Sequence, residues 1–228
     1  MNKKESRKIN ISVEGINCEK MYFKYLAILI NTSNKNVYNL KIDPKKMNPM
    51  EYAKRNAFKH ADQRRGNRKI PYIHIQDIED YYDDYQRKKF HELIDSMRMA
   101  EKQLGITSEP GYSNYTFELW MLLHVADMKH VVQDRHSYLA PINRRFHRNY
   151  KDIDEFKNHN EFQKILNEFV TLDSISLAIN RAEKIVAGNS SSRKIRETYK
   201  GFSYYRDNPD LSVHKIVRMI LDICQVKL

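Results

Sequence analysis

The chain has 228 residues, of which 41% are hydrophobic, so it can bury one sizeable core. Gly and Pro number only six each, which argues against long disordered stretches. The net charge of +11 favours a polyanionic partner such as nucleic acid. No apolar run approaches the roughly 18 residues of a membrane span, and no secretory pattern is present. We therefore expect a cytoplasmic protein without a membrane segment.

The first half of the chain alternates between strand and helix patterns. Alternating apolar residues predict strands over residues 9–13, 37–42, 71–76 and 106–109. Helical spacing predicts helices over residues 19–30, from Pro49 to the basic loop at 63–69, after the acidic run 77–80, and over 115–128. Such alternation is typical of a mostly parallel sheet covered by helices, so we predict an α/β fold.

The second half of the chain has a different pattern. Apolar residues at helical spacing predict helices around residues 162–169, 175–185 and 213–224, with no strand among them. We therefore predict an α/β core over residues 1–130 and a mostly helical extension over 131–228 that packs on it. One continuous domain is the alternative.

Carboxylates directly follow two of the predicted strands. Glu14 comes after the first strand and Asp77 after the third, with Glu79 and Asp80 within one turn. If these strands are parallel neighbours, their carboxyl ends meet at one edge of the sheet. Gathered carboxylates need a cation, and oxygen ligands favour Mg²⁺ or Mn²⁺. The alternatives are an exposed turn residue for Glu14 and an ordinary helix N-terminus for the acidic run.

The segment 113–124 is apolar around nearly the whole predicted helix, which indicates burial. It nevertheless contains Glu118 and His124. A buried carboxylate must be paired, bound to a metal or protonated, so Glu118 is a candidate metal ligand. Stabilisation by the helix dipole is the alternative for Glu118, and a polar core residue is the alternative for His124.

Basic residues gather in three clusters, interleaved with aromatic residues. We predict that the basic side chains contact nucleic-acid phosphates and that aromatic rings stack on unpaired bases. A solvated charged face with the aromatics in the core is the alternative. The predicted phosphate contacts are Lys20, Arg64, Arg65, Arg68, Arg144, Arg145, Arg148, Arg193 and Lys194. The aromatics are Phe146, Tyr150, Tyr199, Phe202, Tyr204 and Tyr205.

Three motifs resemble those of RloB-like proteins and occur in the same order, so the resemblance spans almost the whole chain. They are VEGINCEKMYF at 13–23, SNYTFELWMLLH at 113–124, which is the most distinctive, and NPDLSVHK at 208–215. Besides the residues already named, these motifs include Gly15, Glu19, Ser113, Asn114 and His214. The acidic run at 77–80 stands where the family has an Asp-x-Asp pair, which reads Asp-Ile-Glu here.

The resemblance implies a TOPRIM-like fold, the Mg²⁺-binding α/β core that topoisomerases, primases and some nucleases share. Carried over, Glu14, Asp77 and Glu79 hold Mg²⁺ or Mn²⁺. In the mechanism that we expect, Asp80 or Glu118 supports a second ion or positions water. RloB-like proteins are encoded beside bacterial abortive-infection genes, often with an ABC-type ATPase. The resemblance therefore also implies a role in anti-phage defence and an ATPase partner.

We expect a metal-dependent nuclease that hydrolyses phosphodiester bonds in DNA or RNA, tRNA included. The alternative is a non-catalytic subunit that binds nucleic acid or a nucleotide and regulates a defence ATPase. The change from Asp to Glu at position 79 favours this alternative slightly. A primase ranks last, because the chain is small and lacks a zinc module. The choice between DNA and RNA and the oligomeric state, including a homo-oligomer, stay open.

Overall fold

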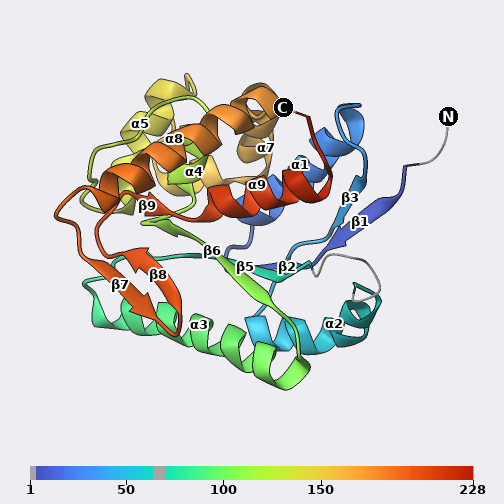
Figure 1. The fold of residues 1–228 in the computed structure, drawn as a ribbon. Helices are drawn as coiled ribbons and strands as arrows, with labels where there is room; N and C mark the ends of the chain where they lie inside the picture. The colour runs from blue at the N-terminus through green and yellow to red at the C-terminus, as the bar shows by residue number, and fades with distance from the viewer. Residues whose placement is uncertain (1–3, 64–69, 228) are drawn as a thin grey trace.

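The computed structural model describes residues 4–63 and 70–227. Its central sheet has the strand order β4 (Lys45–Lys46), β2 (Ile11–Val13), β5 (Tyr72–Asp77), β6 (Ser108–Asn114) and β9 (Asp210–Leu211). All neighbouring pairs in this sheet are parallel except β6 and β9. Strand β1 (Ser6–Ile9) leads into β2 and pairs in parallel with β3 (Asn39–Ile42), as Figure 1 shows. The prediction of a mostly parallel α/β fold is confirmed.

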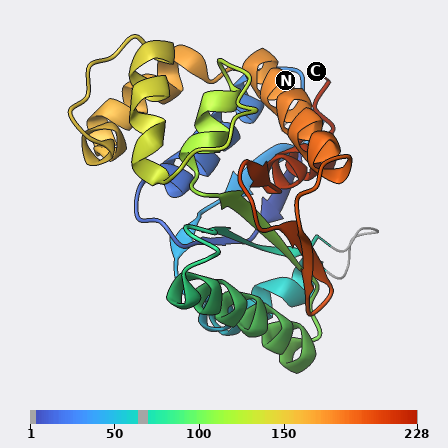
Figure 2. The ribbon, with the colours of Figure 1, turned by 90° about the vertical axis from the view of Figure 1, so that its left-hand side faces the viewer.

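Helices cover both faces of the sheet (Figures 1 and 2). One face carries α2 (Pro49–Gln63) and α3 (Asp84–Leu104). The other face carries α1 (Cys18–Thr32), α4 (Glu118–Leu123), α8 (Leu172–Ser190) and α9 (Val213–Ile223). Because both faces are covered, β2 and the first five residues of β5 are buried, as is usual for parallel strands.

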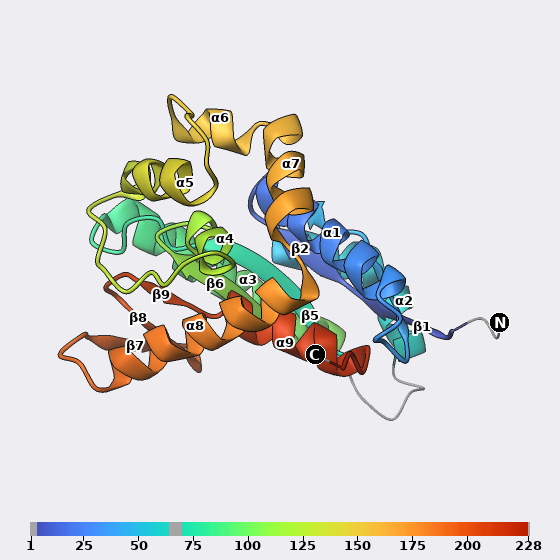
Figure 3. The same cartoon turned by 90° about the horizontal axis from the view of Figure 1, so that it is seen from above.

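The two halves of the chain share one hydrophobic cluster, which runs from Ile9 in β1 to Cys224 after α9. The second half contributes four more helical segments, of which Figure 3 shows α5 near α4 and α7 near α1. These segments are η1 (Arg135–Tyr138), α5 (Leu139–Arg145), α6 (Ile153–Lys157) and α7 (His159–Phe169). Packing against the sheet therefore continues almost to the end of the chain.

The expectation that the second half lacks strands is wrong. Strands β7 (Arg196–Tyr199) and β8 (Phe202–Tyr205) form an antiparallel hairpin, and β9 joins the central sheet. The hairpin turns at Lys200 and Gly201, which both have positive φ, the geometry of a tight two-residue turn. The ring of Tyr204 packs edge-on against Phe90 of α3 at 5.0 Å. Four-residue strands between helices carry too little periodicity to stand out in the sequence.

Two further boundaries differ from the sequence expectation. Strand β6 extends through Asn114, so the fourth strand is longer than 106–109, and α4 begins at Glu118 rather than near Tyr115. The strand pairs with β5 in register from Tyr72 with Ser108 to Asp77 with Ser113. This pairing brings the start of the distinctive motif to the end of β5. Within the described residues, no helix is both long and apolar enough to cross a membrane.

Candidate functional site

Glu14 and Asp77 meet at the carboxyl edge of the sheet. Strands β2 and β5 are parallel neighbours with Val13 opposite Ile75, so Glu14 directly follows β2 beside the last residue of β5. The backbone N–H of Glu14 donates to the carbonyl of Ile75 at 2.9 Å. Oε2 of Glu14 accepts a hydrogen bond from the backbone N–H of Asp77 at 3.2 Å. Strand register alone therefore places these two acidic residues together.

Glu19 reaches the same edge from the first turn of α1. Its side chain is buried and folds back over the loop after β2, where a Cβ on Gly15 would overlap its carboxyl group. Glycine at position 15 is therefore what lets this carboxyl group approach the backbone. Burial raises the pKa of Glu19 to about 7, with further upward contributions from Glu118 and Glu14.

Glu118, the first residue of α4, is 2% exposed and contacts a lysine from the second half of the chain. Its Oε1 lies 2.8 Å from Nζ of Lys157, the last residue of α6. Its Oε2 has no hydrogen-bond partner, and neither does Oδ1 of Asp77. Burial, followed by the charges of Glu19, Glu118 and Glu14, raises the pKa of Asp77 well above its usual value.

These four acidic side chains influence one another electrostatically, and we call them the carboxylate cluster: Glu14, Glu19, Asp77 and Glu118. Two lysines oppose their charge, because Lys89 of α3 forms an ion pair with Glu14 while Lys157 pairs with Glu118. Four carboxylates against two ammonium groups leave two negative charges unbalanced at full ionisation. Because burial raises the pKa values of Glu19 and Asp77, full ionisation requires a cation that displaces their protons.

The donor chemistry of the carboxylate cluster fits Mg²⁺ or Mn²⁺. All donors are carboxylate oxygens, which these hard cations prefer, and the free Oδ1 of Asp77 is buried without a partner. In the part of the chain that the structure describes, no three Asp, Glu, His or Cys side chains form a ready ligand set. Ion pairs with lysines engage Glu14 and Glu118 instead. Ligation therefore requires these side chains to turn toward the ion.

Glu79 and Asp80 lie outside the carboxylate cluster. Glu79 is half-buried, and its Oε1 is 3.8 Å from a guanidinium nitrogen of Arg135. Asp80 is exposed, and its Oδ1 accepts a hydrogen bond from the backbone N–H of Tyr82 at 2.9 Å. The chain bends after Asp77, where the N–H of Ile78 donates to the carbonyl of Ser113 at 2.9 Å. The contacts of Glu79 and Asp80 are therefore with Arg135 and Tyr82, although the charge of Glu79 also acts on Lys89, the partner of Glu14.

The remaining motif residues lie in the core or along β6. His124 Nδ1 is 3.0 Å from the carbonyl oxygen of Trp120, and burial lowers its pKa to about 4. Burial also lowers the pKa of His214 to about 4. Asn114 Nδ2 donates to the carbonyl of Arg206 at 2.8 Å, while Oγ of Ser113 is buried without a partner. The two histidines are therefore neutral core residues at neutral pH.

The predicted phosphate contacts occupy different environments. Arg64, Arg65 and Arg68 lie outside the described residues. Arg144, Arg145 and Arg193 are exposed. Two others make internal contacts: Arg148 pairs with Glu168 at 2.7 Å, and Lys194 Nζ donates to the carbonyl of Asn208 at 2.9 Å. Lys20 lines a hollow of about 270 Å³ with Lys24 and His159, beside the loop that carries Gly15.

The exposed aromatic residues are not those that the sequence indicated. Phe146, Tyr150, Tyr204 and Tyr205 are buried, and Tyr199 and Phe202 are half-buried. Among the described residues the exposed aromatic side chains are Tyr82, at 61%, and Tyr85, at 72%. Both lie between the acidic run and the first turn of α3. The sequence did not indicate that Tyr82 and Tyr85 are functional, because they lie in a strongly acidic segment that resembles an ordinary charged helix N-terminus.

Sequence reasoning also missed Lys89 and Lys157. Lys89 lies in a basic stretch of α3, and Lys157 lies 80 positions beyond Asp77 in a segment that resembles a connection. No local pattern links either lysine to the carboxylates, because only the folded chain brings them together. Exposed surface lysines with the same local sequence features are common.

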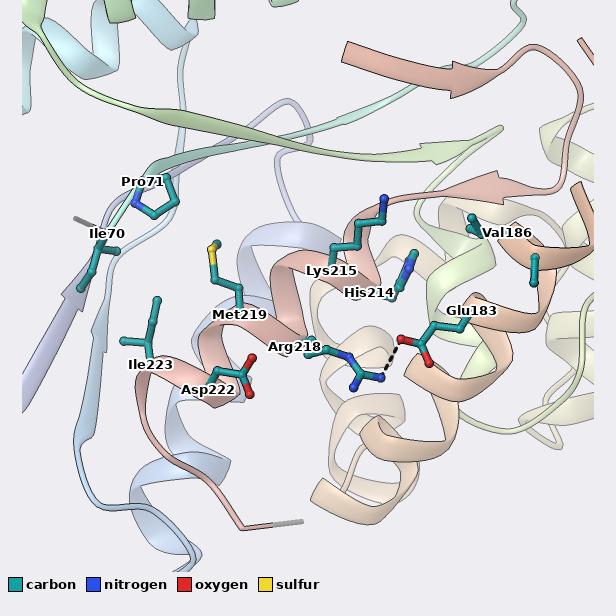
Figure 4. Close-up of a pocket in the computed structure, with 11 residues that line it drawn as sticks. Ile70, Pro71, Glu183, Val186, His214, Lys215, Arg218, Met219, Asp222 and Ile223 are labelled. Carbon is teal, nitrogen blue, oxygen red and sulfur yellow. Dashed lines mark ion pairs between the residues drawn. The ribbon is translucent and has the colours of Figure 1, made fainter. Parts of the chain in front are cut away.

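A larger hollow of about 680 Å³ lies near the amino end of β5. Figure 4 shows its walls, which come from the chain before β5 and from α8 and α9. Arg218 and Glu183 form an ion pair of 2.8 Å there. The carboxylates lie at the other end of β5, so we place the candidate site at the carboxylate cluster rather than in this hollow.

A comparison with protein-family models matches residues 9–220 to the family described as RloB-like protein. No curated protein matches the chain, and no solved structure matches it. The family match covers all three motifs and confirms the resemblance that they indicated.

Proposed function

Because the chain belongs to the RloB-like family, we propose that it is a metal-dependent nuclease with a TOPRIM-like site. It hydrolyses phosphodiester bonds in DNA or RNA, tRNA included, and acts in bacterial anti-phage defence. The observation that carries the proposal is the carboxylate cluster at the carboxyl edge of parallel strands, in which Oδ1 of Asp77 is buried without a partner. Family membership supports an ABC-type ATPase as its partner.

The residues that hold Mg²⁺ or Mn²⁺ in this proposal are Glu14, Asp77 and Glu118, with Glu79 at the rim. When bound, the ion polarises the phosphate and lowers the pKa of a water molecule. Glu19 completes the negative environment from behind the Gly15 loop. Lys89, which is 40% exposed beside Glu14, is placed to contact a phosphate oxygen.

A half-buried lysine beside the loop after β2 and two exposed tyrosines that follow the acidic run support a nucleic-acid substrate. Lys20 lies in a basic hollow next to the loop that follows β2. Tyr82 and Tyr85 expose their rings just after the acidic run in the sequence. Stacking on such rings requires unpaired bases, so single-stranded segments are the preferred substrate in this proposal.

The second candidate function is a non-catalytic subunit that binds nucleic acid and regulates an ATPase. The observation that favours it is the pairing of Glu14 and Glu118 with lysines, together with the missing ligand set within the described part of the chain. In such a protein the lysines would be permanent partners of the carboxylates. Metal binding separates the two candidates.

A cleavage assay tests the proposed function. Single-stranded DNA, plasmid DNA and total tRNA are incubated with Mn²⁺ or Mg²⁺ and the protein, with and without a neighbouring ATPase. Cleavage is expected for the wild type and for Glu183→Gln, a carboxylate in the distant hollow. It is expected to fall at least a hundredfold in Glu14→Gln and Asp77→Asn, as when a metal ligand is removed. No cleavage in any arm would favour the regulatory subunit.

A further inference from the structure

We infer that Lys157 is the resident counter-cation of the carboxylate cluster and competes with the divalent cation for Glu118 and Asp77. This inference concerns regulation of the proposed site and rests on the proposed function for the identity of the competing ion. It assigns a role in the site to a lysine from the helical half of the chain. Movement of the Lys157 ammonium into or out of the carboxylate cluster would then change the affinity of the site for the metal ion.

The contacts of Lys157 are those of a cation inside an anionic site. Its Nζ lies 2.8 Å from Oε1 of Glu118, whose carboxyl group is almost fully buried. Although burial opposes it, the charges of Glu118 and Asp77 raise the pKa of Lys157 above its usual value. A buried carboxylate deprived of such a partner is costly, so Lys157 stabilises the cluster by itself.

A metal ion and the Lys157 ammonium cannot both occupy this position at low cost. Glu118 and Asp77 are two of the proposed metal ligands. The Lys157 ammonium contacts Glu118 and interacts electrostatically with Asp77. Two positive charges that share one carboxylate repel each other across a few ångströms of poorly screened interior. Binding of the divalent ion at these residues therefore requires the ammonium to leave.

The position of Lys157 in the chain permits that movement. It is the last residue of the short helix α6, which Figure 3 shows at the periphery of the molecule, and its side chain is 31% exposed. Its carbonyl oxygen accepts a hydrogen bond from Nδ2 of Asn17 at 3.4 Å, which ties its backbone to the loop after β2. The flexible four-carbon stem can thus swing outward while the backbone stays at the site. There the released ammonium is placed to contact a substrate phosphate.

The test is a calorimetric titration of the full-length protein with Mn²⁺, in the absence of nucleic acid. Lys157→Met removes the charge and keeps the stem, Lys157→Gln provides a second uncharged variant, and Lys157→Arg keeps the charge. Lys164→Met is the control, because Lys164 forms an exposed ion pair with Glu161 at 2.6 Å. We expect about tenfold tighter Mn²⁺ binding in the two uncharged variants and wild-type affinity in the control. Lys157→Arg should stay within about threefold of the wild type.

Two additional readouts separate competition from a merely structural role. In a Glu118→Gln background, Lys157→Met should no longer tighten Mn²⁺ binding, because the contested carboxylate is gone. Metal-free Lys157→Met should melt at a lower temperature than the wild type and regain more stability on adding Mn²⁺. A structural role would lower both stability and metal affinity.

The outcomes distinguish this inference from the proposed function. If the wild type binds Mn²⁺ and both uncharged variants bind it equally or more weakly, the competition is wrong and the metal site stands. If neither the wild type nor any variant binds Mn²⁺, the competition and the proposed metal site both fall. The inference is supported only if Lys157→Met and Lys157→Gln bind Mn²⁺ more tightly than the wild type while the control Lys164→Met does not.

Discussion

Gly15 illustrates how one residue sets the geometry of the site. The carboxyl group of Glu19 lies where a side chain at position 15 would begin. We expect Gly15→Ala to displace the carboxyl group of Glu19 and to weaken cleavage, and to lower the free energy of unfolding by about 1 kcal/mol, because only the end of a flexible side chain has to move. Thermal melts and the cleavage assay measure these effects.

Gly188 provides the matched control for Gly15. A Cβ at this position of α8 meets nothing within 4 Å. Gly188→Ala should therefore raise stability by up to about 1 kcal/mol, because alanine is the better helix former, and should leave cleavage unchanged. Equal effects of the two substitutions would contradict the role assigned to Gly15.

His124 connects the core to the pH dependence of stability. Its pKa falls from an ordinary 6.5 to about 4 on folding, so the unfolded chain binds more protons between these values. Its contribution to stability is therefore present above pH 6.5 and is lost as the pH falls toward 4. The loss amounts to about 3 kcal/mol.

Comparison of the wild type with His124→Asn isolates this contribution from other titrating groups, including Glu19, whose shift has the opposite sign. We expect the wild type to lose stability relative to the variant as the pH falls from 6.5 to 4. Urea melts at several pH values measure the difference. A difference that stays constant with pH would show that His124 titrates normally in the folded protein.

Tyr82, just before α3, and Tyr85, in its first turn, are candidate stacking residues for the proposed substrate. Tyr82 and Tyr85 expose their rings there, whereas Tyr38 is half-exposed on a distant edge and packs against Arg7. We expect the double change Tyr82→Ala and Tyr85→Ala to weaken binding of a single-stranded oligonucleotide at least tenfold, since stacking contributes about 1–3 kcal/mol per base. Tyr38→Ala should have little effect.

Fluorescence anisotropy with labelled single-stranded and duplex oligonucleotides measures this binding. The buffer contains Ca²⁺ in place of Mg²⁺ or Mn²⁺, so that binding is measured without cleavage. We expect the double variant to lose affinity for the single-stranded oligonucleotide and to keep its affinity for the duplex. Unchanged oligonucleotide binding with a lost interaction with the ATPase would instead identify the two tyrosines as a protein-docking surface.

At the level of elements, the sequence predicted what periodicity encodes. The buried strands β2 and β5 and the long helix α3 stood out because apolar residues recur along them at a single period. The hairpin β7–β8 was missed because its strands have four residues each and its turn depends on Lys200 adopting positive φ. Lysine gives no sequence signal for that conformation.

At the level of the whole molecule, strand order determines the site more than any local motif does. The meeting of Glu14 and Asp77 follows from two parallel neighbouring strands, so the sequence could predict it. The positions of Lys89 and Lys157 depend on the packing of α3 and α6 around the sheet edge. Such contacts between distant segments leave no pattern in a single sequence, which is why the counter-cations were not predicted.

The positive charge of the whole chain contrasts with the negative charge of this site. The net charge of +11 would attract nucleic acid to the protein, whereas the carboxylate cluster itself would repel phosphate. A divalent cation in the carboxylate cluster would remove that repulsion. Metal binding is therefore the claim on which the account depends.

The most direct measurement is calorimetric titration of Mn²⁺ into the wild type and into Asp77→Asn. Asp77 is half-buried and its Oδ1 is buried without a partner, so the amide should preserve the fold and should melt at or above the wild-type temperature when no metal is present. We predict a saturable Mn²⁺ site in the wild type that is weakened at least tenfold in Asp77→Asn. A wild type that binds no Mn²⁺, or a folded Asp77→Asn that binds it equally well, would contradict the account.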